Sequence, residues 1–126
     1  MPATRDISVL NLGIGGGRLL RPGIGPAGLA RLSRDVYGQA GARWVIVELG
    51  VNDLGARIKA QAAGQAFASA QDLIAGYQKV VSGCREHHVR VALATITPFA
   101  GATWYSTPEI ERDRQVVNRW IRQAGS

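Results

Sequence analysis

Two short stretches of the sequence carry hydrogen-bond donors that could hold an oxyanion. The first is the glycine-rich stretch 13–18, GIGGGR, which follows the apolar run Ile7–Leu12. The second is Gly50-Val-Asn-Asp53, which follows the apolar run Trp44–Leu49. Glycines can leave backbone N–H groups pointing into a cleft, and the side-chain amide of Asn52 adds two further donors. A backbone N–H and an amide that converge on one point would form an oxyanion hole.

Each stretch also has an ordinary structural explanation. A glycine cluster is usually a turn, and Asn-Asp after a strand usually caps a helix or lies in a loop. A dinucleotide-binding fingerprint would need glycine in place of Arg18, and a helix where Arg21-Pro-Gly-Ile-Gly25 intervenes. A phosphate loop would need a Lys-Ser or Lys-Thr ending, which the stretch lacks. The sequence therefore predicts no nucleotide site, no other cofactor and no metal.

The elements that must position these stretches alternate between strands and helices. Three apolar runs predict buried strands: Ile7–Leu12, Trp44–Leu49 and Val89–Ile96. Helical spacing predicts helices that start near Pro26, after Ser69, and at the stretch 106–109, Ser-Thr-Pro-Glu. This order predicts a parallel α/β sheet, in which ligands bind beyond the carboxyl ends of the strands. The segments that should gather at that edge are 13–18, 50–53 and 97–99.

The composition is that of an ordinary globular chain with a basic surface. Of its 126 residues 46% are hydrophobic and 19% are charged, and the net charge is +6. Because the arginines are scattered, we interpret them as a solvated surface, and no nucleic-acid partner is predicted; weak, salt-sensitive binding is the alternative. The single cysteine, Cys84, excludes an intrachain disulfide and is expected in the core. The sequence contains neither an apolar run of membrane-span length nor a visible signal peptide, so it predicts no compartment.

The two donor stretches together resemble a known family. NLGIGG at 11–16, followed by GVND at 50–53, is similar to the second and third sequence blocks of the SGNH hydrolases, also called GDSL esterases and lipases. Other stretches extend the resemblance over nearly the whole chain: Asp72-Leu-Ile-Ala-Gly-Tyr77, Thr95-Ile-Thr-Pro-Phe99 and Asn118-Arg-Trp-Ile-Arg122. The resemblance implies a flavodoxin-like three-layer α/β/α sandwich. It also implies an ester hydrolase that acts on acyl esters, acetylated sugars or lipids.

The resemblance further implies roles for individual residues. Gly16 would give its backbone N–H to the oxyanion, and Asn52 would give its side-chain amide. Asp53 would brace the loop rather than touch the reacting atoms. The residues expected around the substrate are Gly15, Gly17, Asp53, Thr97 and Phe99.

Two other parts of the family pattern are missing from the sequence. It contains no Gly-Asp-Ser, which would supply the nucleophile, and no Asp-x-x-His, which would supply the base. His87 and His88 lead into the amino end of the third predicted strand, opposite the expected site. Ser106 follows that strand, but a serine without a neighbouring base is a poor nucleophile, so we expect it to cap a helix.

We therefore expect residues 1–126 to form a single, truncated SGNH-type domain that carries oxyanion donors but does not turn over esters by itself. In such a sheet the nucleophile strand is central, so the first predicted strand, Ile7–Leu12, would lack its neighbour. If the chain is a fragment of a longer protein, its exposed strand edges would favour self-association. Otherwise the strand could shift to pair with Trp44–Leu49, or a partner chain could fill the slot. The alternative is a non-catalytic module that binds an anion or a carbohydrate through the same loops.

Overall fold

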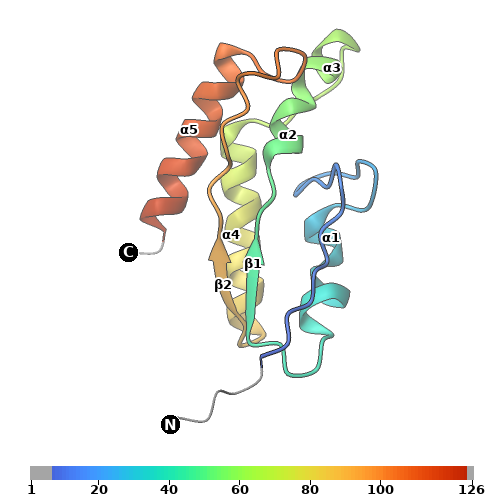
Figure 1. The fold of residues 1–126 in the computed structure, drawn as a ribbon, viewed down its shortest axis with the longest axis vertical. Helices are drawn as coiled ribbons and strands as arrows, with labels where there is room; N and C mark the ends of the chain where they lie inside the picture. The colour runs from blue at the N-terminus through green and yellow to red at the C-terminus, as the bar shows by residue number, and fades with distance from the viewer. Residues whose placement is uncertain (1–6, 125–126) are drawn as a thin grey trace.

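The computed structural model describes residues 7–124 of the chain, and its elements are labelled in Figure 1. They follow in this order: helix α1 (Gly28–Leu32), the π-helical turn η1 (Ser33–Tyr37), strand β1 (Trp44–Val47), helices α2 (Val51–Gly55), α3 (Arg57–Ala62) and α4 (Ala70–Glu86), strand β2 (Arg90–Leu93) and helix α5 (Pro108–Gln123). The chain is thus α/β, as the sequence predicts.

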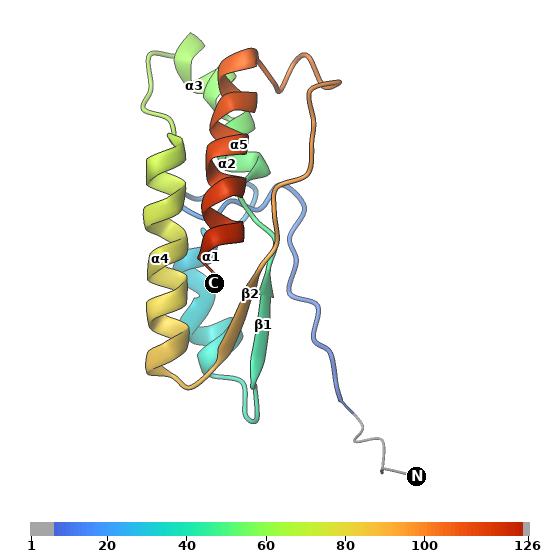
Figure 2. The same cartoon turned by 90° about the vertical axis from the view of Figure 1, so that its left-hand side faces the viewer.

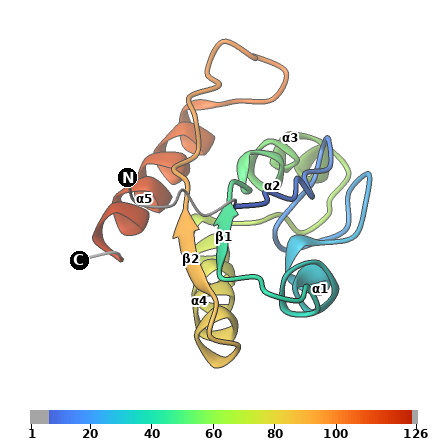
Figure 3. The same cartoon turned by 60° about the horizontal axis from the view of Figure 1, so that its bottom comes forward.

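The two strands pair in parallel to form a small sheet. Trp44 lies opposite Arg90, and Val47 lies opposite Leu93. Helix α4 joins the strands and lies to one side of them, as Figure 2 shows. Helices α1 and α5 both contact α4. All three helices lie on one face of the strand pair (Figure 2), with α1 towards β1 and α5 towards β2 (Figure 3). Within the described residues the arrangement is a two-stranded sheet with these helices, and the predicted three-layer sandwich is not confirmed.

The predicted strand at Ile7–Leu12 is wrong, so the three predicted strands become two. The segment forms no strand and does not shift to pair with β1, whose partner is β2. Apolar alternation makes a strand only where a neighbouring strand accepts its backbone hydrogen bonds. Ile7 is 84% exposed and Val9 is 87% exposed, so the segment also buries little of its apolar surface.

The helix starts follow local capping signals in the sequence. Ser69 Oγ accepts a hydrogen bond from the Asp72 N–H at 3.1 Å, and the Asp72 carboxylate accepts one from the Ser69 N–H at 2.9 Å. This reciprocal pair forms a capping box at the predicted start of α4. At the start of α5 the cap is Thr107, whose Oγ1 accepts from the Ile110 N–H at 3.3 Å. The capping role expected for Ser106 therefore belongs to its neighbour.

The core lies between α4, α5 and the inner face of the sheet. Its fully buried side chains come mainly from one face of α4 and one face of α5: Leu73, Tyr77, Val80, Cys84, Ile110 and Val117. Cys84 is thus a core residue, as its place in the helical pattern predicts. The loop around Leu19 reaches this core, so the glycine-rich segment is anchored from its carboxyl end.

Candidate functional site

Asp53 joins the glycine-rich loop to the start of α2. Its carboxylate accepts hydrogen bonds from the N–H of Leu19 at 2.7 Å and from the N–H of Leu20 at 2.9 Å. The residue is only 4% exposed. Burial raises the pKa of Asp53 above its ordinary value, while the two amides and the charge of Arg18 oppose that rise. The buried carboxylate therefore holds Leu19 and Leu20, which directly follow the glycine-rich stretch, against the start of α2.

The turn from β1 into α2 depends on Gly50. Its φ of 113° is a left-handed conformation that favours glycine. A Cβ at this position would also lie 2.8 Å from both Ile96 Cδ1 and the Tyr77 hydroxyl. That hydroxyl donates to the carbonyl of Leu49 at 2.6 Å, which fixes the end of the strand segment. The close approach of these groups sets where α2 begins and where Asn52 lies.

The Asn52 side chain is held by two hydrogen bonds. Its Nδ2 donates to the carbonyl of Gly17 at 3.0 Å, and its Oδ1 accepts from the Tyr105 hydroxyl at 2.8 Å. An amide nitrogen carries two protons, so one donor remains beyond the bond to Gly17. The carbonyl of Gly17 can only accept, so the end of the amide that faces it is the nitrogen, and the Tyr105 hydroxyl then donates to the oxygen. Asn52 is therefore oriented with its donor group against the glycine-rich loop.

The glycine-rich loop turns sharply beside Asn52. Gly16 has a φ of 72°, and a Cβ there would lie 2.6 Å from Ile24 Cδ1. Gly17 is buried, and its N–H donates to the carbonyl of Ile14 at 2.9 Å. Gly15 is exposed, with no atom within 4 Å of where its Cβ would be. No hydrogen-bond acceptor for the Gly16 N–H is found within residues 7–124.

Thr97 and Phe99 occupy the segment that follows β2. Ile96 at its start is fixed by Asn118, whose Oδ1 accepts from the Ile96 N–H and whose Nδ2 donates to the Ile96 carbonyl, both at 2.8 Å. Phe99 is half-buried, and its ring lies 6.1 Å from the ring of Tyr105. Phe99 is thereby connected to Asn52 through the tyrosine. Thr97 is exposed, and no described contact links it to the loop.

Three residues of this region were not singled out by sequence reasoning. Tyr105 binds the Asn52 amide across 53 positions, a separation that leaves no local signal. Arg18 was considered only as a departure from the nucleotide fingerprint. Asn118 is 3% exposed on the apolar face of α5. A polar residue between Val117 and Ile121 on that face indicates a buried hydrogen-bonding role, so the sequence did carry a signal for it.

The histidines lie away from Asn52, at the other end of the sheet. His88 lines a shallow pocket with Arg43, Trp44 and Arg90, at the amino ends of β1 and β2. The ring of His87 stacks on Tyr37 at 4.0 Å, and its Nδ1 lies 2.9 Å from the Gly83 carbonyl. These contacts are structural, and they match the expected separation of the histidines from the donor stretches.

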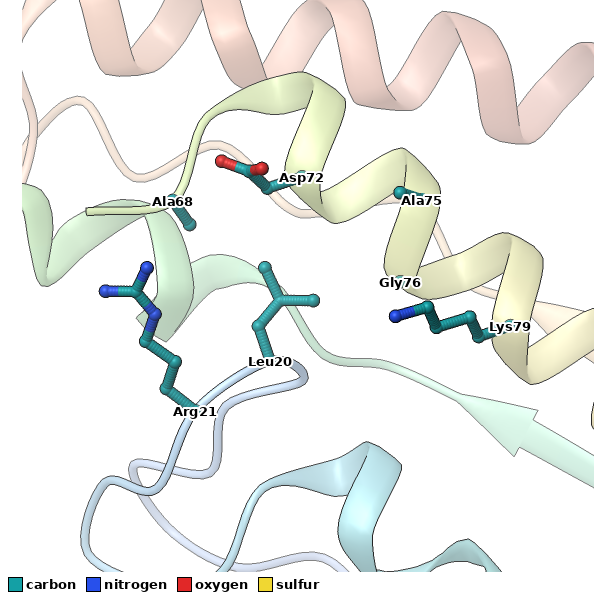
Figure 4. Close-up of a pocket in the computed structure, with 7 residues that line it drawn as sticks. All are labelled: Leu20, Arg21, Ala68, Asp72, Ala75, Gly76 and Lys79. Atoms are coloured by element: carbon teal, nitrogen blue, oxygen red, sulfur yellow. The ribbon is translucent and has the colours of Figure 1, made fainter. Parts of the chain in front are cut away.

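A second shallow pocket lies on the other side of the loop, against α4 (Figure 4). Leu20 and Arg21 form one wall, and Asp72 and Lys79 of α4 lie opposite them. Arg21 Nη1 donates to the carbonyl of Ala66 at 2.7 Å. None of the predicted site residues lines this pocket, so it is separate from the Asn52 region.

Among residues 7–124 no group of three or more His, Cys, Asp or Glu side chains could hold a metal ion. Within the same range no helix is long and apolar enough to cross a bilayer.

The chain matches one known protein family over nearly its whole length. Residues 2–126 match the GDSL-like Lipase/Acylhydrolase family, so the chain belongs to that family. A search of curated proteins found no match. Membership in an acylhydrolase family supports a function of the esterase or lipase type in general, and a small-molecule ester fits such a family as substrate.

Proposed function

We propose that this chain is the oxyanion-hole portion of an SGNH-type ester hydrolase, with Gly16 and Asn52 as the two oxyanion donors. One observation supports this most strongly: Asn52 Nδ2 lies 3.0 Å from the carbonyl of Gly17, directly beside Gly16 in the loop. In ester hydrolysis the carbonyl oxygen becomes an oxyanion in the tetrahedral intermediate. A backbone N–H and an amide N–H that meet it stabilise the transition state more than the ground state.

The surrounding residues support the same roles. The buried Asp53 ties the loop to α2, so we propose that it braces the donors and stays out of contact with the reacting atoms. Gly15 and Gly17 would let the backbone approach the substrate. Phe99, half-buried against Tyr105, offers an apolar wall for an acyl group, and Thr97 would lie at its exposed end.

We also propose that these 126 residues are the central portion of a longer hydrolase domain and do not turn over esters by themselves. The absent Gly-Asp-Ser and Asp-x-x-His motifs support this, because a donor pair without nucleophile and base leaves the chemical step undone. The test is the purified chain incubated with p-nitrophenyl acetate. We expect no hydrolysis above that of the Asn52→Ala variant. Turnover that disappears in Asn52→Ala would keep the donor assignment and overturn the proposed inactivity.

A further part of the proposal concerns self-association through the sheet. The carbonyls of Arg43 and Val47 accept bonds from the N–H groups of Arg90 and Ala94, so by strand alternation the backbone groups of Trp44 and Ile46 point to the opposite edge. No partner for that edge is found within residues 7–124. Both side chains are exposed, Trp44 by 61% and Ile46 by 76%. An open edge with apolar side chains favours pairing with another chain.

Sedimentation equilibrium over a range of concentrations tests the self-association. We expect the chain to associate, and we expect Ile46→Lys to weaken association because it places a charge beside the open edge. A matched control is Gln71→Lys, since Gln71 is exposed on α4, away from the sheet edge. A monomer at all concentrations would contradict this part of the proposal.

The alternative function is a non-catalytic module that binds an anion or a carbohydrate with the same loops. The half-buried Arg18 beside the glycine-rich loop favours an anion over a neutral sugar. Calorimetric titration with acetate and with glucose distinguishes the two ligand classes. Tight binding of either ligand by a chain that has no esterase activity would favour the binding module over the ester hydrolase.

A further inference from the structure

A charged side chain lies beside the proposed oxyanion donors. The Arg18 Nε and the carbonyl oxygen of Gly16 both approach the position that a Cβ would take at Gly23, at 3.3 Å and 3.1 Å. Burial raises the pKa of both Asp53 and Tyr105, and the charge of Arg18 opposes that rise in each. Both residues adjoin Asn52, because Tyr105 donates to it and Asp53 follows it in the chain. The Arg18 side chain therefore lies in the same small region as Gly16 and Asn52.

Arg18 differs from the other half-buried arginines of the described chain. Each of those pairs with a carboxylate: Arg31 with Asp35 at 3.4 Å, Arg57 with Asp113 at 2.9 Å and Arg114 with Glu111 at 2.6 Å. No carboxylate within residues 7–124 lies within 4.0 Å of Arg18. Its Nε is buried and makes no hydrogen bond within that range, which is also true of the Nε of Arg31 and Arg57, so the missing carboxylate is what sets Arg18 apart.

A partly desolvated cation without a partner is unfavourable, and a bound anion would remove that cost. The carboxylate of Asp53 is already committed to the amides of Leu19 and Leu20. A neutral ester would satisfy Gly16 and Asn52 but would leave the guanidinium as it is. A ligand with both an ester and an anionic group would satisfy all three, since guanidinium and carboxylate match in geometry.

We propose that Arg18 is a specificity-determining residue that binds a carboxylate on the ligand of this site. The inference rests on the proposed function, because it takes Gly16 and Asn52 as the groups that hold the ester. It deepens that function by naming the substrate class: esters whose acyl or alcohol part carries a negative charge.

The test compares two esters that differ in one charge. Monomethyl succinate has one ester and one carboxylate, and dimethyl succinate has two esters and no charge. The ¹⁵N-labelled chain is titrated with each, and the Gly16 amide and Asn52 side-chain amide signals report the apparent Kd. We expect the monomethyl ester to bind about three- to tenfold more tightly, the range of a partly exposed ion pair with a charge-assisted hydrogen bond.

Variants of the arginine assign the preference. In Arg18→Gln the ratio of the two Kd values should fall to about one, and in Arg18→Lys part of it should return, because the charge is kept. Arg21→Gln is the matched control: Arg21 lies on the same loop, but its guanidinium is bound to Ala66, and its ratio should equal that of the wild type. The dispersion of the spectra shows whether each variant is folded.

The outcomes separate this inference from the proposed function. Equal Kd values in the wild type, or a ratio that persists in Arg18→Gln, would overturn the role of Arg18 while leaving the donors intact. If neither ester shifts the Gly16 and Asn52 signals, the proposed donor site fails, and this inference fails with it. A carboxylate preference that disappears in Arg18→Gln and survives in Arg21→Gln supports the inference.

Discussion

The carboxyl end of the sheet and its open edge differ in how completely their groups are paired. At the carboxyl end the buried Asp53 accepts two backbone N–H groups, and Asn118 binds both backbone groups of Ile96. At the open edge Trp44 and Ile46 are exposed, and the preceding segment Ile7–Leu12 forms no strand. The donor region is thus held by contacts within the chain, while one edge of the sheet is not.

The difference shows which features depend on distant parts of a fold. The position of Asn52 depends on a turn at Gly50 and on bonds to the loop, all of which the described chain contains. A strand, by contrast, needs a neighbour along its whole length. The proposed donors can therefore be organised beside the two-stranded sheet that residues 7–124 form.

The largest loss of stability is expected from a change at the carboxyl end of the sheet, where Asp53 lies. Asp53→Ala leaves the N–H groups of Leu19 and Leu20 without their acceptor, and the free energy of unfolding should fall by about 3 kcal/mol, since hydrogen bonds to charged groups contribute roughly 1.5–3 kcal/mol each. Urea denaturation measures the loss. Asp53→Asn keeps one acceptor oxygen and should lose less. A loss below about 1 kcal/mol would mean that the carboxylate does not brace the loop.

A smaller loss of stability, which depends on pH, is expected when the ion pair between Glu111 and Arg114 on α5 is removed. Two hydrogen bonds from Arg114 and one from Gln115 lower the pKa of Glu111 to about 2 from 4.5. A folded-state pKa below the unfolded value stabilises the fold above pH 4.5, and this contribution is lost as the pH falls through 4.5 towards 2. Glu111→Gln should therefore lower the free energy of unfolding by about 0.5–1 kcal/mol at pH 7.

The measurement for this pair is urea denaturation of wild type and Glu111→Gln at pH 7, 4 and 2. The difference between the two proteins should shrink as the pH falls. The comparison is Glu109→Gln, because Glu109 pairs with Arg112 where both side chains are exposed, so its effect should have the same direction and a smaller size. A difference that is the same at all three pH values would contradict the assigned role of the Glu111 charge.

The smallest loss of stability is expected on the exposed face of β1, where two neighbouring residues of the strand differ in burial. Ile46→Ala should change the free energy of unfolding by less than about 0.5 kcal/mol, because the side chain is 76% exposed. Its neighbour Val47 is 6% exposed, and Val47→Ala should cost about 2 kcal/mol through the cavity it leaves. Thermal unfolding of the monomer measures both. Equal losses would mean that the outer face of β1 is covered in solution.

Local signals in the sequence predicted much of this fold, and non-local contacts account for what it did not predict. The capping box of Ser69 and Asp72 involves residues three positions apart, so the start of α4 was readable. The segment Ile7–Leu12 has the apolar pattern of a strand, but whether it pairs depends on a neighbour that a local pattern does not reveal.

The same limit applies to the candidate site. Apolar runs that end in Gly50-Val-Asn-Asp53 and in the glycine-rich loop predicted that the two stretches would lie together, and the contacts of Asp53 are in that region. Tyr105 was not predicted, because its bond to Asn52 spans 53 positions and its neighbours carry no motif. Arg18 was not predicted as a site residue, because its significance comes from burial without a partner.

The most direct test of the donor assignment is kinetic. It uses the product of the full reading frame that contains this chain, in which we expect a Gly-Asp-Ser upstream and an Asp-x-x-His downstream. In that protein Asn52→Ala should lower kcat for ester hydrolysis by about 10²–10³ with little change in KM, while Gln71→Ala on the exposed face of α4 should leave both unchanged. A full-frame enzyme whose kcat survives Asn52→Ala, or a frame without those two motifs, would contradict the assignment of Gly16 and Asn52 as oxyanion donors of an ester hydrolase.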